Sequence, residues 1–306
     1  MAKGSALEVD GRRVALSNLD KVLYPADGTT KHDVVAHYLA MADVILPQLA
    51  DRPLTRKRWP DGVTGTTAFF EKNLPRGAPP WLRTVTLDSP GSSKDREQIT
   101  YPVLEDRAGL IWVANLAALE LHAPQWRVGG RGSVRPPDRL VIDLDPGPPA
   151  GLADCAEIAL LVRERLAVDG FTCIPVTSGS KGLQLYASTA GRQDASVVRD
   201  YVHAIARELE HRHPERVLSR MTRAIRTGKV LLDWSQNSSA KTTIVPYSLR
   251  GRERAWVATP RTWDELADSG SLQQVHRSAL PGRLDSYGDL LTTTDVTDAP
   301  RVPVDG

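Results

Sequence analysis

Cysteine is scarce in this chain: Cys155 and Cys173 are the two among 306 residues. Both lie in apolar surroundings without the spacing of a metal site, so the sequence excludes a disulfide framework and fits a reducing compartment. Long hydrophobic runs are also missing, because the longest, residues 110–121, is too short to cross a bilayer and contains Asn115 and Glu120. The first thirteen residues lack the apolar segment of a signal peptide. We therefore expect a cytoplasmic protein without a membrane segment.

An excess of charge of one sign is missing too, since the net charge at pH 7 is +2. Bulk charge therefore gives no sign of a nucleic-acid partner, and local clusters carry more information. Residues 52–58 and 212–229 are strongly basic, with Glu215 as the single acid in them. Such a cluster is either a solvated face or a contact for an anionic partner, and the sequence leaves both open. The 41% hydrophobic and 25% charged residues are ordinary for a globular protein of one large domain or two small ones.

Helical and strand patterns mix along the chain, which predicts an α/β or α+β protein. A hairpin is expected over residues 6–16, around Asp10 and Gly11. Helical periods predict helices, the first with Thr30 as its N-cap, over residues 29–49, 111–121, 152–170 and 195–213. Apolar runs predict strands over residues 171–177, 183–188 and 229–234, and another at the end of the polar stretch 89–106.

Two carboxylates separated by a single residue follow an apolar strand: Asp143 and Asp145 come after residues 140–142. Side chains at i and i+2 of a strand point to the same face, so these carboxylates repel unless a proton or cation lies between them. Asp233 likewise follows a short apolar strand, and three such acids could hold Mg²⁺ or Mn²⁺ for phosphoryl transfer. Acid pairs of this kind also occur in sugar-nucleotide transferases and phosphatases, and a solvated strand end is the structural alternative.

A glycine-rich turn and several cations accompany the acids. Residues 178–182, Ser-Gly-Ser-Lys-Gly, lie between two predicted strands and could cradle a phosphate with backbone N–H groups, hydroxyls and the Lys181 ammonium. The turn lacks the Walker A spacing, and a plain tight hairpin turn is the alternative. Arg226 precedes the third acid, Arg250 follows another strand-like stretch, and His122 closes a predicted helix, where histidines often simply pack. Together these groups suit nucleoside triphosphate chemistry.

Short motifs in a fixed order resemble the polymerase domain of bacterial ligase D, a member of the archaeo-eukaryotic primase superfamily. From about residue 10 to residue 260 they are NLDKVLYP, TTK, RPLTRKRWPDG, AFFEK, LELH, IDLDPG, TSGSKG, LLDWSQN and VPYSLRGR. The resemblance implies an α+β fold: a primase-like catalytic core with a twisted, mostly antiparallel sheet flanked by helices, and a mixed α/β N-terminal module. We expect a primase-polymerase domain over residues 1–290, comprising the module (about 1–135) and the core (about 136–290), and a mobile tail over 291–306.

The resemblance also implies an activity. Such domains extend a DNA primer on a template with nucleoside triphosphates, preferring ribonucleotides, at short gaps or broken ends with a downstream 5′-phosphate. The implied cofactor is Mn²⁺ or Mg²⁺ in a two-metal mechanism. The implied partners are DNA, NTP or dNTP, an ATP-dependent DNA ligase and Ku. The chain is expected to be a monomer that serves end joining or short-gap repair.

Matched motif by motif, the resemblance assigns roles to residues of this chain. The metal-binding and catalytic acids would be Asp143, Asp145 and Asp233, with His122 as a further catalytic group. Nucleotide binding would involve Ser178, Lys181, Gln184, Arg226, Gln236 and Arg250, and base stacking would involve Phe69 and Phe70, for which core packing is the alternative. The downstream 5′-phosphate would bind Lys21 and Lys31, assisted by the N–H groups of the helix that begins there, with Lys57 as a further backbone contact.

Two features depart from the family pattern, and two other functions fit the same residues. The loop over residues 88–102 looks longer and more charged than in relatives that bridge two broken ends. Many relatives have histidine where Gln184 stands, and a neutral amide can hydrogen-bond a phosphate or sugar without supplying charge. The K-x-D-G motif of an adenylating ligase is absent from the sequence. A metal-dependent nuclease or phosphatase could use the three acids. A non-catalytic module could bind 5′-phosphorylated DNA ends through Lys21 and Lys31.

Overall fold

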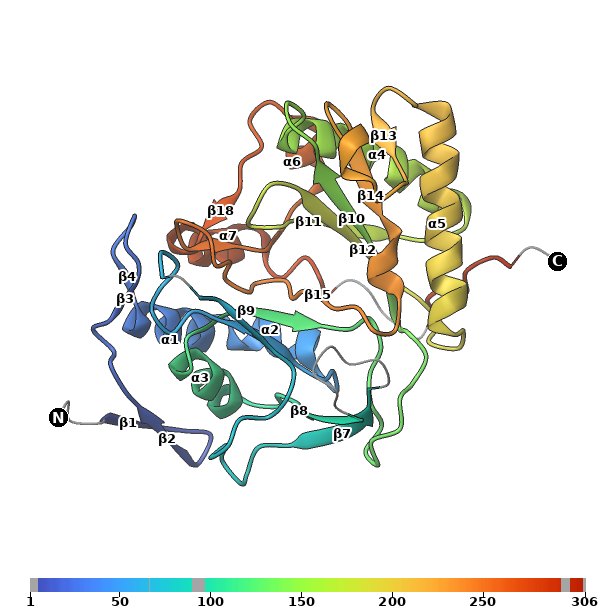
Figure 1. Ribbon diagram of the computed structural model, residues 1–306. Helices are drawn as coiled ribbons and strands as arrows, with labels where there is room; N and C mark the ends of the chain where they lie inside the picture. The colour runs from blue at the N-terminus through green and yellow to red at the C-terminus, as the bar shows by residue number, and fades with distance from the viewer. Residues whose placement is uncertain (1–4, 66, 90–96, 293–297, 305–306) are drawn as a thin grey trace. The chain divides into compact units, whose positions relative to one another are not determined.

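The computed structural model describes residues 5–65, 67–89, 97–292 and 298–304. The chain forms two compact units, each discontinuous in sequence and each with its own sheet (Figure 1). Unit 1 consists of Met1–Ala123, Arg127–Val134 and Ile244–Val257. Unit 2 consists of Pro124–Trp126, Arg135–Thr243 and Ala258–Gly306.

A six-stranded sheet forms the centre of unit 2, in the order β13-β14-β10-β12-β11-β17. Its strands are β13 (Val217–Leu218), β14 (Val230–Asp233), β10 (Arg139–Pro146), β12 (Leu183–Ser188), β11 (Cys173–Thr177) and β17 (Thr259–Pro260). Neighbouring strands are antiparallel except β13 and β14, which are parallel. The predicted α+β class and the mostly antiparallel sheet are therefore confirmed.

Alternation along β10 separates an apolar face from a polar one. Leu140, Ile142 and Leu144 are fully buried in a core with helices α4 (Leu152–Val168) and α5 (Ala195–Arg212). Burial of such side chains supplies most of the favourable free energy of folding, roughly 1.5–3 kcal/mol for each. The residues between them point to the opposite face of the sheet, and they include Arg139, Val141, Asp143 and Asp145.

Shorter elements complete unit 2: η1 (Arg223–Ile225), η2 (Trp234–Asn237), α6 (Trp263–Ala267), β18 (Val275–His276), η3 (Arg277–Ala279) and α7 (Leu280–Tyr287). Part of the predicted tail, residues 293–297 and 305–306, lies outside the described residues. Val302 is described and is only 2% exposed in the core of unit 2. Gln193 donates from Nε2 to the Val302 carbonyl (2.9 Å) and accepts from the Val302 N–H at Oε1 (2.8 Å).

Unit 1 combines a small sheet with helices and hairpins. The sheet has the order β15-β9-β5-β6, with β15 (Thr243–Ile244, of which Ile244 belongs to unit 1), β9 (Ala118–Ala123), β5 (Thr55–Arg58) and β6 (Phe69–Glu71). The hairpins are β1 (Ser5–Val9) with β2 (Arg12–Leu16), β3 (Val22–Tyr24) with β4 (Thr29–Thr30), and β7 (Thr84–Asp88) with β8 (Gln98–Pro102). The remaining elements are α1 (Lys31–Ala40), α2 (Ala42–Leu49), α3 (Arg107–Asn115) and β16 (Trp256–Val257).

Local sequence signals predicted several of these elements well. The hairpin over residues 6–16 is confirmed, and its turn residues Asp10 and Gly11 have φ of 49° and 69°, as a type I′ turn requires. Thr30 is the N-cap of α1, and its side chain and that of Asp33 form a capping box. The predicted single helix over 29–49 is wrong in one respect, because it divides into α1 and α2 at Met41.

The predicted helix over residues 111–121 is confirmed for residues 111–115 and wrong beyond them. Helix α3 starts after its N-cap Asp106 and ends at Asn115, and β9 follows from Ala118. Ala117 joins the two elements with a φ of 56°, in the left-handed region that an L-residue rarely adopts. A fully buried helix and a fully buried strand both appear as continuous apolar runs, so hydrophobicity could not place the boundary.

No helix in the part of the chain that the structure describes is both long and apolar enough to cross a membrane.

Cys155 and Cys173 are buried, and each is a free thiol. Burial raises the pKa of both thiols above the ordinary range. Neither is therefore disposed to act as a nucleophile.

Candidate active site

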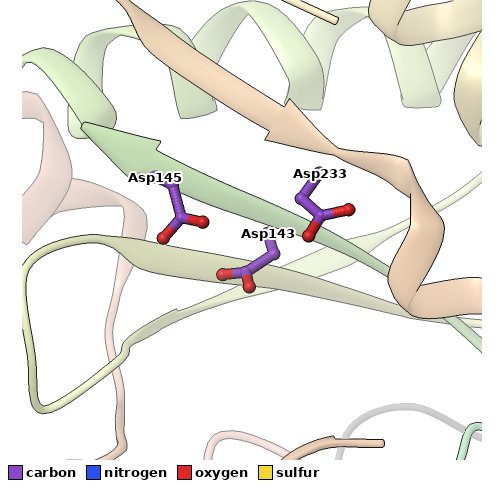
Figure 2. A group of neighbouring side chains, drawn as sticks. All are labelled: Asp143, Asp145 and Asp233. Atoms are coloured by element: carbon purple, nitrogen blue, oxygen red, sulfur yellow. The ribbon is translucent and has the colours of Figure 1, made fainter. Parts of the chain in front are cut away.

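Three carboxylates converge on the polar face of the unit 2 sheet. Asp143 on β10 stands directly opposite Asp233 at the end of β14, and Asp145 follows two residues further along β10. One oxygen from each of the three lies within 4.8 Å of the others (Figure 2). Like charges this close disfavour one another, and a hard divalent cation with oxygen ligands relieves that repulsion. The three acids therefore form a donor set that fits Mg²⁺ or Mn²⁺.

The Asp233 side chain is held in place by the helical turn that follows it. Its Oδ1 accepts hydrogen bonds from the N–H (2.9 Å) and the Oγ (2.6 Å) of Ser235, and its Oδ2 accepts from Nε2 of Gln236 (2.9 Å). Asp233 is thus the N-cap of η2 as well as a member of the acidic triad. Gln236 lies beside the third acid, as the sequence motif predicted.

Gln184 continues the same row of side chains across the sheet. It lies opposite Asp143 on β12, is 4% exposed, and accepts a hydrogen bond at Oε1 from the Tyr186 hydroxyl (2.9 Å). The row Asp233, Asp143 and Gln184 therefore places a neutral amide, and no charge, next to the acids.

A buried polar network beyond Gln184 was missed by the sequence analysis. Arg139 donates from Nε to Oε1 of Gln125 (2.7 Å), and Gln125 donates from Nε2 to Oγ1 of Thr243 (2.8 Å), which lies 3.3 Å from the Tyr186 hydroxyl. Arg139 is 7% exposed and lies on the same face of β10 as the acids. Arg139 and Asp143 are separated by an even number of positions along the strand, and every second residue of a strand shares a face. This spacing was the one sequence signal that could have identified Arg139.

The glycine-rich turn over residues 178–182 has three N–H groups bonded within the chain, so the expected cradle of free N–H groups is corrected for Ser178, Gly179 and Ser180. The N–H of Ser178 donates to the Gly182 carbonyl (3.0 Å), that of Gly179 to Oε1 of Gln274 (2.7 Å), and that of Ser180 to Oγ of Ser178 (3.3 Å). Gln274 also donates from Nε2 to the Gly182 carbonyl (3.0 Å), so it clamps the turn from both sides. The Ser178 hydroxyl and the exposed Lys181 ammonium remain candidates to contact an anion.

The turn and Arg226 both approach β10 closely. Leu183 pairs with Leu144, and an added Cβ at Gly182 would lie 1.9 Å from the Leu144 carbonyl oxygen. A Cβ at Gly147 would likewise lie 1.9 Å from the carbonyl oxygen of Arg226. Gly182 and Gly147 thus let the turn over residues 178–182 and the Arg226 segment pack directly against the strand that carries Asp143 and Asp145.

A second group of predicted residues gathers on one face of the unit 1 sheet. Phe70 on β6 lies opposite Lys57 on β5, and Lys57 lies opposite Glu120 on β9. His122, two residues beyond Glu120, contacts Phe70 edge to face with ring centroids 5.7 Å apart. The prediction that His122 closes a helix is therefore wrong, because His122 belongs to strand β9. Arg250 joins the group through Glu120, with its Nε 3.4 Å from a Glu120 oxygen.

Phe69 and Phe70 are 44% and 49% exposed, so the core-packing alternative for them is wrong. We expect Phe70→Ala to weaken primer extension by about 1–3 kcal/mol, the contribution of one base stacked on an aromatic side chain. The melting temperature should hardly change. Phe171→Ala is a matched control, since Phe171 is 3% exposed in the unit 2 core and its loss should cost roughly 3–5 kcal/mol of stability. A fall in stability with normal specific activity of Phe70→Ala would contradict the stacking role.

Lys21 and Lys31 meet where the β3–β4 hairpin opens, and the Lys31 N–H donates to the Lys21 carbonyl (2.8 Å). The Lys21 ammonium contacts Oδ1 of Asp61 (2.8 Å), while that of Lys31 donates to the Ser17 carbonyl (2.8 Å) and is largely buried. Burial, the charge of Lys21 and the charge of Arg58 lower the pKa of Lys31. An anion bound here would offset this repulsion between cations.

The N–H groups at the start of α1 were expected to assist phosphate binding, and the structure corrects this expectation. The N–H groups of Lys31 and His32 donate to the carbonyls of Lys21 and Leu19, and that of Asp33 donates to the Thr30 side chain. The first-turn N–H groups of α1 are therefore already bonded within the chain. Any phosphate would be bound by the two ammonium groups and not by the peptide groups of the helix.

Comparisons with known proteins agree with this geometry. The model of the LigD primase-polymerase domain matches residues 30–291. The chain is 47% identical over 288 residues to the multifunctional non-homologous end joining protein LigD of Mycolicibacterium smegmatis. The matched region covers 94% of this chain and 37% of that protein. It is 31% identical over 258 residues to the bifunctional non-homologous end joining protein LigD of Bacillus subtilis, and the matched region covers 84% of this chain and 40% of that protein. Its structure is similar to the polymerase domain from Mycobacterium tuberculosis ligase D in complex with DNA, with a TM-score of 0.87, 47% identity and coverage of 94% of this chain and 99% of that one.

The fold and the acidic triad define a nucleotidyltransferase of the polymerase class with a site for divalent metal. The chain spans about two fifths of the length of the curated relatives it matches. It belongs to the LigD primase-polymerase domain family, so the resemblance read from its motifs is confirmed.

Proposed function

We propose that this chain extends a DNA primer on a template with nucleoside triphosphates, preferring ribonucleotides, at short gaps or broken ends that carry a downstream 5′-phosphate. The observation that carries the proposal is the triad: Asp143, Asp145 and Asp233 within 4.8 Å of one another on one face of the sheet. A bound pair of Mn²⁺ or Mg²⁺ ions would lower the pKa of the primer 3′-hydroxyl and stabilise charge on the reacting phosphate.

The chain's own residues would bind and orient the reactants. The Ser178 hydroxyl and the Lys181 ammonium flank the triad strand and would bind phosphate oxygens of the nucleotide, while Gln236 keeps Asp233 oriented. In unit 1, His122 and Phe70 contact each other on one face of the sheet, and Arg250 lies beside Glu120 of that sheet. His122 and Arg250 would bind the triphosphate, and Phe70 would stack on a base. The chemistry is then attack of the primer hydroxyl on the α-phosphorus, with pyrophosphate as leaving group.

The proposed setting is bacterial end joining or short-gap repair in the cytoplasm. The relatives named above are end joining proteins, and the buried free thiols fit a reducing compartment. Ku and an ATP-dependent DNA ligase are the proposed partners.

A primer-extension assay separates this function from its rivals. The protein is incubated with a gapped duplex, Mn²⁺ and one labelled triphosphate at a time, with each NTP in competition with its dNTP. Extension that follows the template base, with the NTP favoured, supports the proposal. A shortened primer or released phosphate would indicate a nuclease or phosphatase, and binding with an unchanged primer would indicate a non-catalytic end-binding module. Equal or reversed use of dNTP would refute the ribonucleotide preference.

The proposed 5′-phosphate site predicts a difference between two DNA ligands. Gapped DNA with a downstream 5′-phosphate should bind more tightly than the same DNA with a 5′-hydroxyl, because the backbones of Lys21 and Lys31 meet there, the charge of Lys21 acts on Lys31, and a terminal phosphate carries extra charge. The double variant Lys21→Ala with Lys31→Ala should erase that difference and reduce the salt slope of binding by roughly one unit for each lost contact.

Lys241→Ala is the control, since Lys241 is an exposed lysine of unit 2 and its removal changes only the net charge. Binding is measured at matched salt, and melting curves verify folding of each variant. If wild-type protein bound the 5′-hydroxyl and 5′-phosphate ligands equally, the phosphate site would be wrong.

A further inference from the structure

One buried carboxylate, that of Glu120, lies among the side chains of Lys57, His122 and Arg250 in unit 1. Glu120 is 3% exposed. Its Oε2 lies 2.9 Å from Nε2 of His122, and its Oε1 accepts from the Gly251 N–H (3.0 Å) and faces Nε of Arg250 (3.4 Å). Lys57 is its cross-strand neighbour on β5. A single acid therefore faces three groups that are proposed to bind nucleotide or DNA.

Glu120 is an anion at every pH at which the protein would work. Burial by itself raises the pKa of this carboxyl, but the hydrogen bond from His122 and the charges of Arg250, His122 and Lys57 lower the pKa to about 2. An ionised carboxylate can only accept hydrogen bonds. The hydrogen between the two side chains is therefore carried by Nε2 of His122, which leaves Nδ1 as the ring nitrogen available to a ligand.

The segment that carries Arg250 is fastened to β9 around the same carboxylate. The Leu121 N–H donates to Oγ of Ser248 (2.9 Å), and the Tyr24 hydroxyl donates to the Arg250 carbonyl (2.9 Å). A Cβ at Gly251 would lie 2.1 Å from the Trp59 ring, so only glycine lets its N–H reach Glu120. The backbone on both sides of Arg250 is thus fixed, and Glu120 is an ion-pair partner of its side chain.

We infer that Glu120 is a positioning residue for nucleotide binding: it fixes the ring of His122 with Nδ1 available to the triphosphate and holds the Arg250 guanidinium in place. The inference rests on the proposed function and deepens it. Carboxylates that orient a histidine in this way are common behind metal-bound histidines, where their loss costs roughly 10- to 100-fold in affinity or activity. The same logic applies to a histidine whose ligand is a phosphate oxygen.

The groups that face His122 set the sign of a pH effect. Burial and the charges of Arg250 and Lys57 lower the pKa of His122, whereas the hydrogen bond and charge of Glu120 raise it. The Phe70 ring adds no charge. Glu120→Gln removes the one factor that favours the imidazolium, so the pKa of His122 should fall. Triphosphate binding that depends on a protonated His122 should then be lost at lower pH than in the wild type.

The first experiment measures extension by the full chain and by Glu120→Gln, Glu120→Asp and the control Asp169→Asn. Asp169 is also a carboxylate whose pKa is lowered, by Arg165 and Tyr201 despite some burial, but it lies at the end of α4. Glu120→Gln should raise KM for the triphosphate about 10-fold and move the alkaline limb of its pH profile to lower pH, while binding of gapped DNA stays within about twofold. Glu120→Asp should restore part of the loss. An unchanged KM and pH profile in folded Glu120→Gln would overturn the inference.

The second experiment does not depend on catalysis, so it separates this inference from the proposed function. Ring ¹⁵N signals of His122 are followed by NMR through a pH titration of the wild type and Glu120→Gln. The wild type should show hydrogen on Nε2 in the neutral ring, and the variant should show a lower pKa and a mixture of tautomers. If the wild type failed to extend primers, the proposed function would fall. If the two titrations coincided, the role of Glu120 would be wrong.

Discussion

Asp143→Ala, Asp145→Ala and Asp233→Ala should each reduce primer extension on the order of 10³-fold or more, equivalent to about 4 kcal/mol of transition-state stabilisation. The reason is the geometry of the triad, because the oxygens that would share metal ions come from all three residues and lie within 4.8 Å of one another. Removing one ligand leaves the other two unable to hold the cations in place for an in-line displacement. Binding of gapped DNA should survive, since it depends on the basic side chains.

Asp233 needs its own control because it has two roles. Its side chain also caps η2, so Asp233→Ala should lose about 1 kcal/mol of stability through the missing cap. Asp233→Asn keeps an oxygen for the Ser235 N–H and should be equally inactive but closer to wild type in melting temperature. Asp200→Ala, an exposed acid on α5, should leave extension unchanged. Extension by Asp233→Ala at near wild-type rate would show that the third acid is not part of the site.

Gly182→Ala should damage both stability and activity, although the substitution adds a single methyl group. The new Cβ would lie 1.9 Å from the Leu144 carbonyl oxygen and 3.0 Å from Cδ of Pro146. Strand β12 must therefore move away from β10 at its first residue, at a cost of roughly 1–3 kcal/mol or more for overpacking. The displaced segment is the turn that carries Ser178 and Lys181, and the strand it leaves carries Asp145.

The matched control is Gly282→Ala. Gly282 is within α7, and an added Cβ there would meet nothing within 4 Å. Alanine is favoured over glycine in a helix by roughly 0.5–1 kcal/mol, so this variant should be as stable as the wild type or slightly more stable. Thermal melting and extension by the folded fraction are measured for both variants. A Gly182→Ala protein with wild-type melting temperature and extension would show that the turn accommodates the added methyl group without loss of stability or activity.

The sequence predicted the site where the chemistry depends on local geometry. Asp143 and Asp145 had to share a face because they are two residues apart on a strand, and Asp233 had to lie at a strand end because its own apolar run stops there. The turn over residues 178–182 was also predicted from local sequence, because its glycines lie between two apolar strand runs. The Gly179 N–H was expected to be free for a phosphate, but it donates to Gln274. Gln274 lies 95 residues away, and no local pattern predicts such a contact.

The same limit explains the other errors. The N-terminal peptide groups of α1 were expected to bind phosphate, but the preceding loop folds back and bonds them through the Lys21 and Leu19 carbonyls. His122 was assigned to a helix end because the buried run before it has no period that separates helix from strand. Glu120 was overlooked because its partners Arg250 and Gly251 lie more than 120 residues later in the sequence. A glutamate in an apolar run does not by itself indicate such contacts.

The discontinuity of unit 1 has a consequence for the order in which the protein folds during synthesis. Residues 244–257 supply Tyr247 and Leu249 to the interior of unit 1, where they are 1% and 0% exposed, and the Tyr247 carbonyl lies 3.0 Å from the buried His37 ring. A ribosome-bound chain that ends before residue 244 lacks this segment, although strands β10 to β14 of unit 2 have already been made. The N-terminal unit should therefore be completed late in translation, and a fragment of residues 1–135 should not fold by itself.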